Sequence, residues 1–204
     1  MKKLITATLT AVLLAACQQG GDSADFEELR ADVDSMKLDI YGAEIGTCEE
    51  SKIFKSIAPY KSSLDGLPSA DMDLEAWHKA NAERDNVMTT NSGLQYIVVQ
   101  EGNADDPSPK PTDMVKVQYH GIFPDGKKFD SSYDRGRPSE FQANGVITGW
   151  VEALAGMKPC EARTLFVPGH LAYGPAGRPG IPSNATLMFH VQLLGIEKKG
   201  LIKK

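Results

Sequence analysis

From residue 92 onward, apolar side chains recur at every second position, and this alternation restricts the possible folds more than any other feature. Val115, Val117 and Tyr119, for example, alternate with Lys116 and Gln118. Successive side chains of a strand point to opposite faces of a sheet, so a period of two predicts half-buried strands. We expect strands over residues 94–99, 115–120, 127–130, 162–167 and 186–196.

The segments between these strands favour an antiparallel sheet with one helix packed on it. Residues 124–126 read Pro-Asp-Gly, a turn in which Pro fixes φ and Gly accepts a positive φ. Ile147, Trp150 and Leu154 have helical spacing, and Gly156 follows as the stop signal. Residues 169–184 are rich in Gly and Pro and predict a long loop. The expected fold is α+β, an antiparallel sheet wrapped on one short helix.

The preceding residues, 23–88, predict a small helical segment. A first helix is expected after Ser23, a second over 49–57 that ends before Pro59, and a third over 71–84 with Leu74 and Trp77 as its apolar positions. The first helix carries an apolar stripe. Such a stripe packs either within its own chain or against a second copy, and the pattern leaves both open. The stripe consists of Phe26, Leu29, Val33, Met36 and Ile40.

Composition and motif spacing exclude several kinds of function. The 204 residues include 22 basic and 27 acidic side chains, a balance that argues against nucleic-acid binding. The histidines lack metal-ligand spacing, and His120 and His190 fall on the polar faces of their expected strands, where we expect solvent. Residues 121–128 nearly match a phosphate loop, but Lys128 replaces the hydroxyl residue that would reach magnesium. We therefore expect no metal and no cofactor.

The N-terminus has the layout of an export signal. Lys2 and Lys3 precede an apolar stretch over 4–16 that is too short to span a membrane. Leu14-Ala15-Ala16-Cys17 resembles the lipobox of bacterial lipoproteins, which implies cleavage before Cys17 and acylation of its thiol. The alternative is an ordinary signal peptide with Cys at the cut. Gln18, rather than Asp, after the cysteine points to the outer membrane. The expected divisions are 1–16 signal peptide, 17–22 tether, 23–88 helical segment and 89–204 sheet domain.

Several motifs in the sheet domain resemble one enzyme family. They occur in family order and with family-like spacing between about residues 90 and 198, and they match the FKBP-type peptidyl-prolyl isomerases. The entry to the domain, residues 77–93, is similar to that of the periplasmic macrophage-infectivity-potentiator-type members. The motifs are Val117-Gln-Tyr119-His-Gly121, residues 125–132, Val146-Ile147-Thr-Gly149-Trp150, Tyr173-Gly174 and residues 181–189.

The resemblance implies an isomerase that rotates X–Pro bonds in exported polypeptides of the periplasm; the alternative is a non-catalytic chaperone or interaction module on the same fold. It implies that Trp150 forms a pocket floor, that Asp130 places a carboxylate near the twisting amide, and that Tyr173 offers its hydroxyl to the substrate carbonyl. The implied catalytic residues are Tyr119, Phe129, Asp130, Trp150, Tyr173 and Phe189, and the implied substrate-binding residues are Phe141, Val146, Ile147 and Ile181.

Two further expectations concern rim residues and thiols. Ser139, Gly145 and Arg178 depart from common family residues and open one rim of the implied pocket. With Cys17 acylated, Cys48 and Cys160 remain as the one pair of thiols in an oxidising compartment. We therefore hypothesise a disulfide between them that joins the helical segment to the sheet domain.

Overall fold

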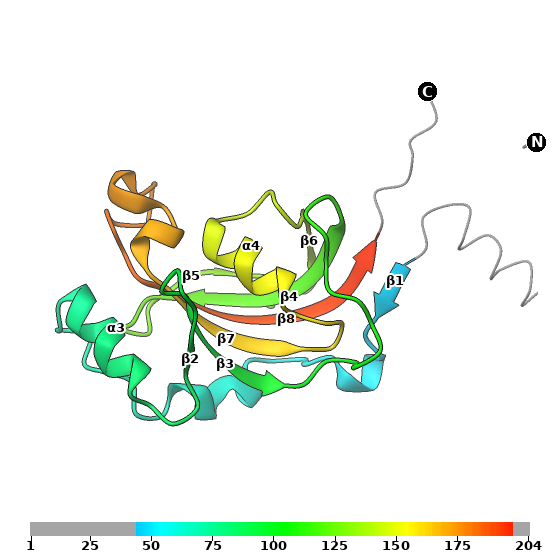
Figure 1. Cartoon of the computed structure of the whole chain (residues 1–204), viewed down its shortest axis with the longest axis horizontal. Coiled ribbons are helices and arrows are strands. Elements are labelled where there is room, and N and C mark those ends of the chain that lie inside the picture. The colour runs from blue at the N-terminus through cyan, green and yellow to red at the C-terminus, as the bar shows by residue number, and fades with distance from the viewer. Residues whose placement is uncertain (1–43, 198–204) are drawn as a thin grey trace, which may run out of the picture. The chain divides into compact units, whose positions relative to one another are not determined.

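The computed structural model describes residues 44–197. These residues form an eight-stranded antiparallel sheet (Figure 1). Its main path runs β2-β3-β7-β8-β4-β5, while β1 pairs with β8 and β6 pairs with β4. The strands are β1 (Glu44–Thr47), β2 (Met88–Thr89), β3 (Gln95–Gln100), β4 (Met114–Ile122), β5 (Lys128–Ser131), β6 (Ser139–Gln142), β7 (Ala162–Val167) and β8 (Leu187–Glu197). The helices are α3 (Leu74–Ala82) and α4 (Thr148–Ala155), with 3₁₀ turns η1 (Glu50–Lys52), η2 (Ala58–Leu64), η3 (Gly169–Leu171) and η4 (Gly174–Ala176).

The five expected strands are present within a few residues of their expected bounds, and the α+β fold is confirmed. Strands β1, β2 and β6 were not expected, because segments of two to four residues are too short to show alternation. The expected first helix, the signal peptide and the tether lie outside the described residues.

The main core lies between the sheet and α4. Trp150 and Leu154 of the helix pack against Val117 and Leu165 of the sheet, and all four side chains are buried. Gly149 lets the helix approach closely, since a Cβ atom there would lie 2.6 Å from a methyl carbon of Val167. The helix ends at Gly156, as the sequence predicts.

The other face of the sheet is covered by residues 50–64, which run beneath it in Figure 1. The helix expected over 49–57 is wrong: only the single turn η1 forms there, and the next 3₁₀ turn begins at Ala58. Pro59 therefore lies in the first turn of a helix instead of after one, a position where its missing N–H costs no hydrogen bond. This segment follows the sheet because Tyr60 is fully buried against it.

His190 corrects the expectation of a solvated histidine, because its side chain is only 1% exposed. The Tyr60 ring stacks on its imidazole with centroids 4.6 Å apart. The Thr164 hydroxyl lies 3.0 Å from His190 Nδ1 and 2.6 Å from the Ser63 hydroxyl. His120, expected to be solvated as well, is half-buried and stacks parallel to His190. The polar face of these strands is thus buried, because the chain before the sheet domain covers it.

Helix α3 forms inside the range expected for the third helix. Asp73 caps it by accepting a hydrogen bond of 3.0 Å from the backbone N–H of Ala76. Trp77 is buried against Phe166 and Met188, as its apolar position predicts. Leu74, expected on the same apolar face, is instead 42% exposed.

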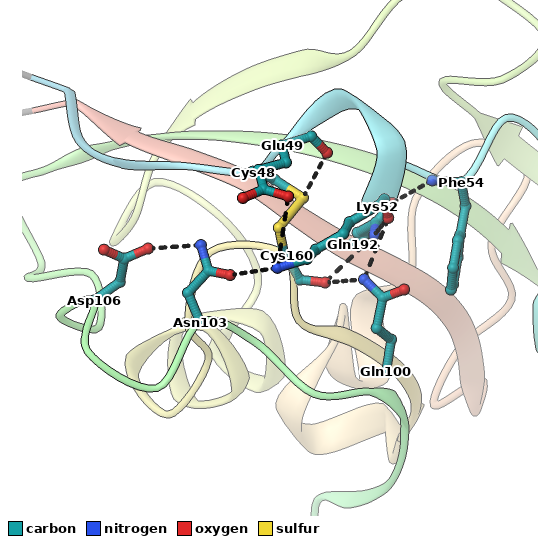
Figure 2. Close-up of a disulfide and its surroundings, with 9 residues drawn as sticks. All are labelled: Cys48, Glu49, Lys52, Phe54, Gln100, Asn103, Asp106, Cys160 and Gln192. Atoms are coloured by element: carbon teal, nitrogen blue, oxygen red, sulfur yellow. Dashed lines mark hydrogen bonds and ion pairs between the residues drawn. A yellow bond between two sulfur atoms is a disulfide. The ribbon is translucent and has the colours of Figure 1, made fainter.

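A disulfide fastens the covering segment to the sheet (Figure 2). Cys48 and Cys160, the hypothesised pair, are bridged, with Cα atoms 4.6 Å apart and a separation of 112 positions in the sequence. Beside the bridge, the buried amide of Gln192 donates to the carbonyl of Lys52 and accepts from the backbone N–H of Phe54, each at 2.8 Å. The compact unit that contains the sheet accordingly begins at Glu44. Within residues 44–197, none of the helices has the length and apolar character needed to cross a membrane.

Candidate functional site

A pocket of about 440 Å³ opens between α4, the strands β4, β5, β6 and β8, and the loop after η3. Nine of the ten residues that the resemblance assigns to catalysis or substrate binding line it. The exception is Ile181, which is 4% exposed and lies in the core next to the pocket. The lining consists of Tyr119, Phe129, Asp130, Phe141, Gly145, Val146, Ile147, Trp150, Tyr173, Arg178 and Phe189.

Aromatic rings fix the shape of this pocket. Trp150, held by α4, meets the rings of Tyr119, Phe141 and Phe189 edge to face, with centroids 5.2–6.0 Å apart. Phe129 meets Phe189 in the same way at 5.4 Å. Edge-to-face pairs are the favoured geometry for aromatic side chains, so these contacts hold the walls rigid. The result is an apolar site with a preformed shape.

One polar cluster interrupts the apolar wall. The Tyr119 hydroxyl donates to Asp130 Oδ2 at 2.5 Å, and Arg135 donates from Nη1 to Asp130 Oδ1 at 2.6 Å and from Nη2 to Tyr119 Oη at 2.8 Å. The same guanidinium nitrogen donates to the Ser139 hydroxyl at 3.0 Å, so the residue that opens the rim also gives Arg135 a partner. The sequence reasoning missed Arg135, whose position depends on the path of an irregular loop that no motif predicts.

The environment of this cluster shifts the pKa values of Asp130 and Tyr119 in opposite directions, away from neutral pH. Burial alone would raise the pKa of Asp130, but hydrogen bonds from Tyr119 and Arg135, together with the guanidinium charge, outweigh burial and hold that pKa below its usual value. Burial, reinforced by the hydrogen bond to Asp130, raises the pKa of the Tyr119 phenol. Asp130 therefore stays ionised and Tyr119 stays protonated across the neutral range. Neither group is prepared to transfer a proton there.

The loop after η3 contributes the remaining rim. Arg178 places its guanidinium 4.6 Å from the centre of the Tyr173 ring, and both side chains line the pocket. Residues Arg178 and Ile181 hold the loop closed through two mutual backbone hydrogen bonds of 3.0 and 2.8 Å. Gly177 has a φ of 57°, and a Cβ atom there would lie 2.5 Å from the carbonyl oxygen of Ile181. This tight turn explains why Ile181 points into the core and Arg178 reaches the rim.

A second hollow, of about 470 Å³, lies on the opposite face of the sheet between residues 47–55 and strands β4 and β8. It includes Lys116 and Gln118, which alternate with the pocket-side residues of β4. It lacks a converging set of aromatic rings around a carboxylate. In the described part of the chain, no three His, Cys, Asp or Glu side chains are grouped so that they could hold a metal ion. The aromatic pocket is therefore the candidate site.

What this pocket can do follows from its shape and chemistry. It is large enough for a small ring and the groups beside it, its walls are mostly apolar and aromatic, and one carboxylate lies at the edge. Such a site can take up an apolar ring with its adjoining amide, and it can favour a less polar form of that amide.

Comparison with known proteins identifies a matching family and several relatives of this chain. The family model described as FKBP-type peptidyl-prolyl cis-trans isomerase matches residues 106–194. The chain is 42% identical over 158 residues to the FKBP-type peptidyl-prolyl cis-trans isomerase FkpA of Aeromonas hydrophila, covering 73% of this chain and 58% of that protein. It is 45% identical over 125 residues to the peptidyl-prolyl cis-trans isomerase Mip of Coxiella burnetii, covering 61% and 54%. The chain thus spans less than two thirds of the length of these curated relatives.

A solved structure supports the fold. The crystal structure of FkpA from Escherichia coli superposes with a TM-score of 0.58 at 31% sequence identity, over 97% of this chain and 83% of that one.

Proposed function

This chain belongs to the FKBP-type peptidyl-prolyl cis-trans isomerase family, and from that premise we propose that it catalyses rotation about X–Pro bonds in polypeptides. The observation that carries the proposal is the convergence of Tyr119, Phe129, Trp150 and Phe189 around the Asp130 carboxylate in one pocket. No metal or cofactor is part of the proposal, since the reaction breaks no bond to hydrogen and transfers no electron.

The physics of the reaction suits such a pocket. Amide resonance keeps the X–Pro bond planar and sets a barrier of roughly 18–20 kcal/mol, so uncatalysed rotation takes tens to hundreds of seconds. In the transition state the amide is twisted and less polar. A dry aromatic site stabilises that state relative to the planar amide, which loses its hydration on entry. Trp150 would support the proline ring, and Asp130 and Tyr173 would contact the polar atoms of the twisting amide.

A matched pair of phenylalanine variants tests this proposal. Phe129 lines the pocket, whereas Phe54 lies on the opposite face of the sheet; both are half-buried. Phe129→Ala should lower kcat/KM for a proline-containing tetrapeptide by about 10–100-fold, because it admits water and loosens the substrate. Phe54→Ala should stay within about twofold of wild type. Equal losses in both variants, or an inactive wild-type protein, would contradict the proposal.

We further propose that the protein is exported and attached to the outer membrane through Cys17. The support is the signal-like layout of residues 1–16, the lipobox-like sequence before Cys17 and the Gln18 that follows it. Several acyl chains on one cysteine would hold the protein firmly, since each buried CH₂ adds about 0.8 kcal/mol. The substrates would then be proline-containing polypeptides of the periplasm.

Replacing the cysteine tests the anchor. Cys17→Ser should move the protein from the membrane fraction to the soluble fraction. A wild-type N-terminus that mass spectrometry finds unmodified would contradict the proposal.

The apolar stripe of residues 26–40 additionally supports a homodimer, and Leu29→Glu should then halve the mass measured by sedimentation equilibrium.

A further inference from the structure

Large apolar side chains that reach solvent are few in the described part of the chain, and two of the four lie together. Met72 and Leu74 stand at the start of α3, with exposed fractions of 37% and 42%. Ile57 and Met88 are exposed to a similar degree elsewhere on the surface. Leu74 borders a hollow of about 310 Å³ whose other walls include Phe123, Pro182 and Ala185.

This hollow lies beside the aromatic pocket on two sides. On one side, the Phe123 ring contacts the Phe129 ring with centroids 5.0 Å apart, and Phe129 lines the pocket. On the other side, the loop that gives Tyr173 to the pocket gives Pro182 to the hollow. In Figure 1, α3, this orange loop and the turn between β4 and β5 lie at the same end of the sheet. The hollow therefore lies next to the candidate site, with the Phe123 and Phe129 rings between them.

The apolar surface continues beyond this hollow along α3. A further hollow, of about 460 Å³, shares Leu74 and Thr186 with the first and is bordered by Glu75 and Lys79 of the helix. Both hollows are open to solvent, and more of their surface is apolar than polar. A largely apolar surface beside a pocket for one residue fits an extended chain, whose side chains follow one another every 3.3–3.6 Å.

We propose that Leu74 and the hollow beside Phe123 form a second subsite, which binds an apolar side chain of the same unfolded polypeptide whose X–Pro bond occupies the aromatic pocket. This inference rests on the proposed isomerase function and extends it to the class of substrate. The Phe123 and Phe129 rings, with centroids 5.0 Å apart, separate the hollow from the pocket, so the bound side chain belongs to a residue a few positions from the proline. The protein would then favour unfolded segments that carry an exposed apolar residue near a proline.

The test compares short and long substrates with one matched pair of variants. Leu74→Ser removes the apolar side chain at the first turn of α3 and leaves the Asp73 cap in place. Met88→Ser removes an equally exposed side chain, 43% against 42%, that borders neither hollow. The substrates are a tetrapeptide with one X–Pro bond and a set of 15-residue peptides with the same bond and a single leucine placed one to six residues to either side.

With wild-type protein, kcat/KM should peak for one leucine position in the series. Leu74→Ser should remove this peak, a loss of about fivefold to tenfold, and leave the tetrapeptide rate unchanged. Met88→Ser should change neither. A flat series in wild type, or an equal loss on the tetrapeptide, would overturn the second subsite while the isomerase function stands.

Binding provides a readout that does not depend on turnover. Fluorescence anisotropy with the labelled best peptide should show weaker binding to Leu74→Ser than to Met88→Ser, even if the wild-type protein proves inactive on the tetrapeptide. Equal affinities would overturn the proposal. So would sedimentation data in which Leu74→Ser dissociates a dimer, since the patch would then be an interface between two copies.

Discussion

The two faces of the sheet are both buried, but by different means. On the face toward α4, apolar side chains of β4 and β8 meet an apolar helix and leave a pocket lined with aromatic rings. On the opposite face, polar side chains of the central strands are buried under residues 50–64. His190, Thr164 and Gln192 are each at most 1% exposed there.

The difference shows that alternation reports which face is apolar, and not which face is buried. Several polar groups buried on this face are paired with one another. Ser63 donates to the carbonyl of Tyr60 at 2.6 Å, so the Thr164 hydroxyl can donate to Ser63 and accept from His190. Burial of hydrogen-bonded polar groups costs far less than burial of unpaired ones. One face therefore carries the proposed chemistry, and the other holds a covering segment in place.

Loss of the disulfide should have the largest effect, and on the covered face alone. The chain-entropy account assigns about 4–5 kcal/mol to a bridge that closes a loop of this length. Cys48→Ala combined with Cys160→Ala should lower the free energy of unfolding in urea by about 4 kcal/mol. Since the bridge is remote from the pocket, kcat/KM of the folded protein should stay within about twofold.

The control for this prediction is chemical reduction. Reductant should destabilise the wild-type protein in the same way and leave the double variant unchanged. A large loss of activity in a variant that is still folded would show that the two faces are coupled.

Acid should also destabilise the covered face first. Burial lowers the pKa of His190 to about 3, whereas a histidine in the unfolded chain titrates near 6.5. Above 6.5 the imidazole is neutral in both states. Below it only the unfolded chain takes up the proton, so stability is lost as the pH falls from 6.5 towards 3. The loss should reach about 2–3 kcal/mol near pH 4, measured by urea unfolding.

His190→Gln identifies the group responsible. The variant is less stable at neutral pH but should show a shallower loss of stability with acid. Burial also lowers the pKa values of His78 and His120, so part of the slope should remain. An unchanged slope would mean that His190 does not govern it.

On the pocket face, the smallest of these effects should come from the carboxylate. Asp130→Leu should lower kcat/KM by about threefold to tenfold, less than Phe129→Ala, because the apolar wall remains. The wild-type rate should be nearly independent of pH in the neutral range, since the pKa of Asp130 lies below its usual value and that of Tyr119 above. A steep bell-shaped profile would show that a proton is transferred in the slow step.

These contrasts also mark what could be predicted from the sequence. Strand β4 and helix α4 could be predicted because their own residues show the spacing of a strand and of a helix, and the pocket could be predicted because its motifs match a family. The burial of His190 could not be predicted, because it depends on Tyr60, 130 positions earlier in the sequence. Arg135 and the exposed Leu74 were missed for a similar reason: loop path and neighbouring elements decide where they lie.

The strand order has a consequence for how the chain acquires its structure. The last strand in sequence, β8, lies in the middle of the sheet and pairs with β1, β4 and β7. A chain that emerges from its N-terminal end first therefore holds β1, β4 and β7 without the strand that joins them. Such long-range pairing is slow to form, and partly formed sheets expose unpaired edges. We therefore expect this sheet to have unpaired strand edges until β8 has joined it.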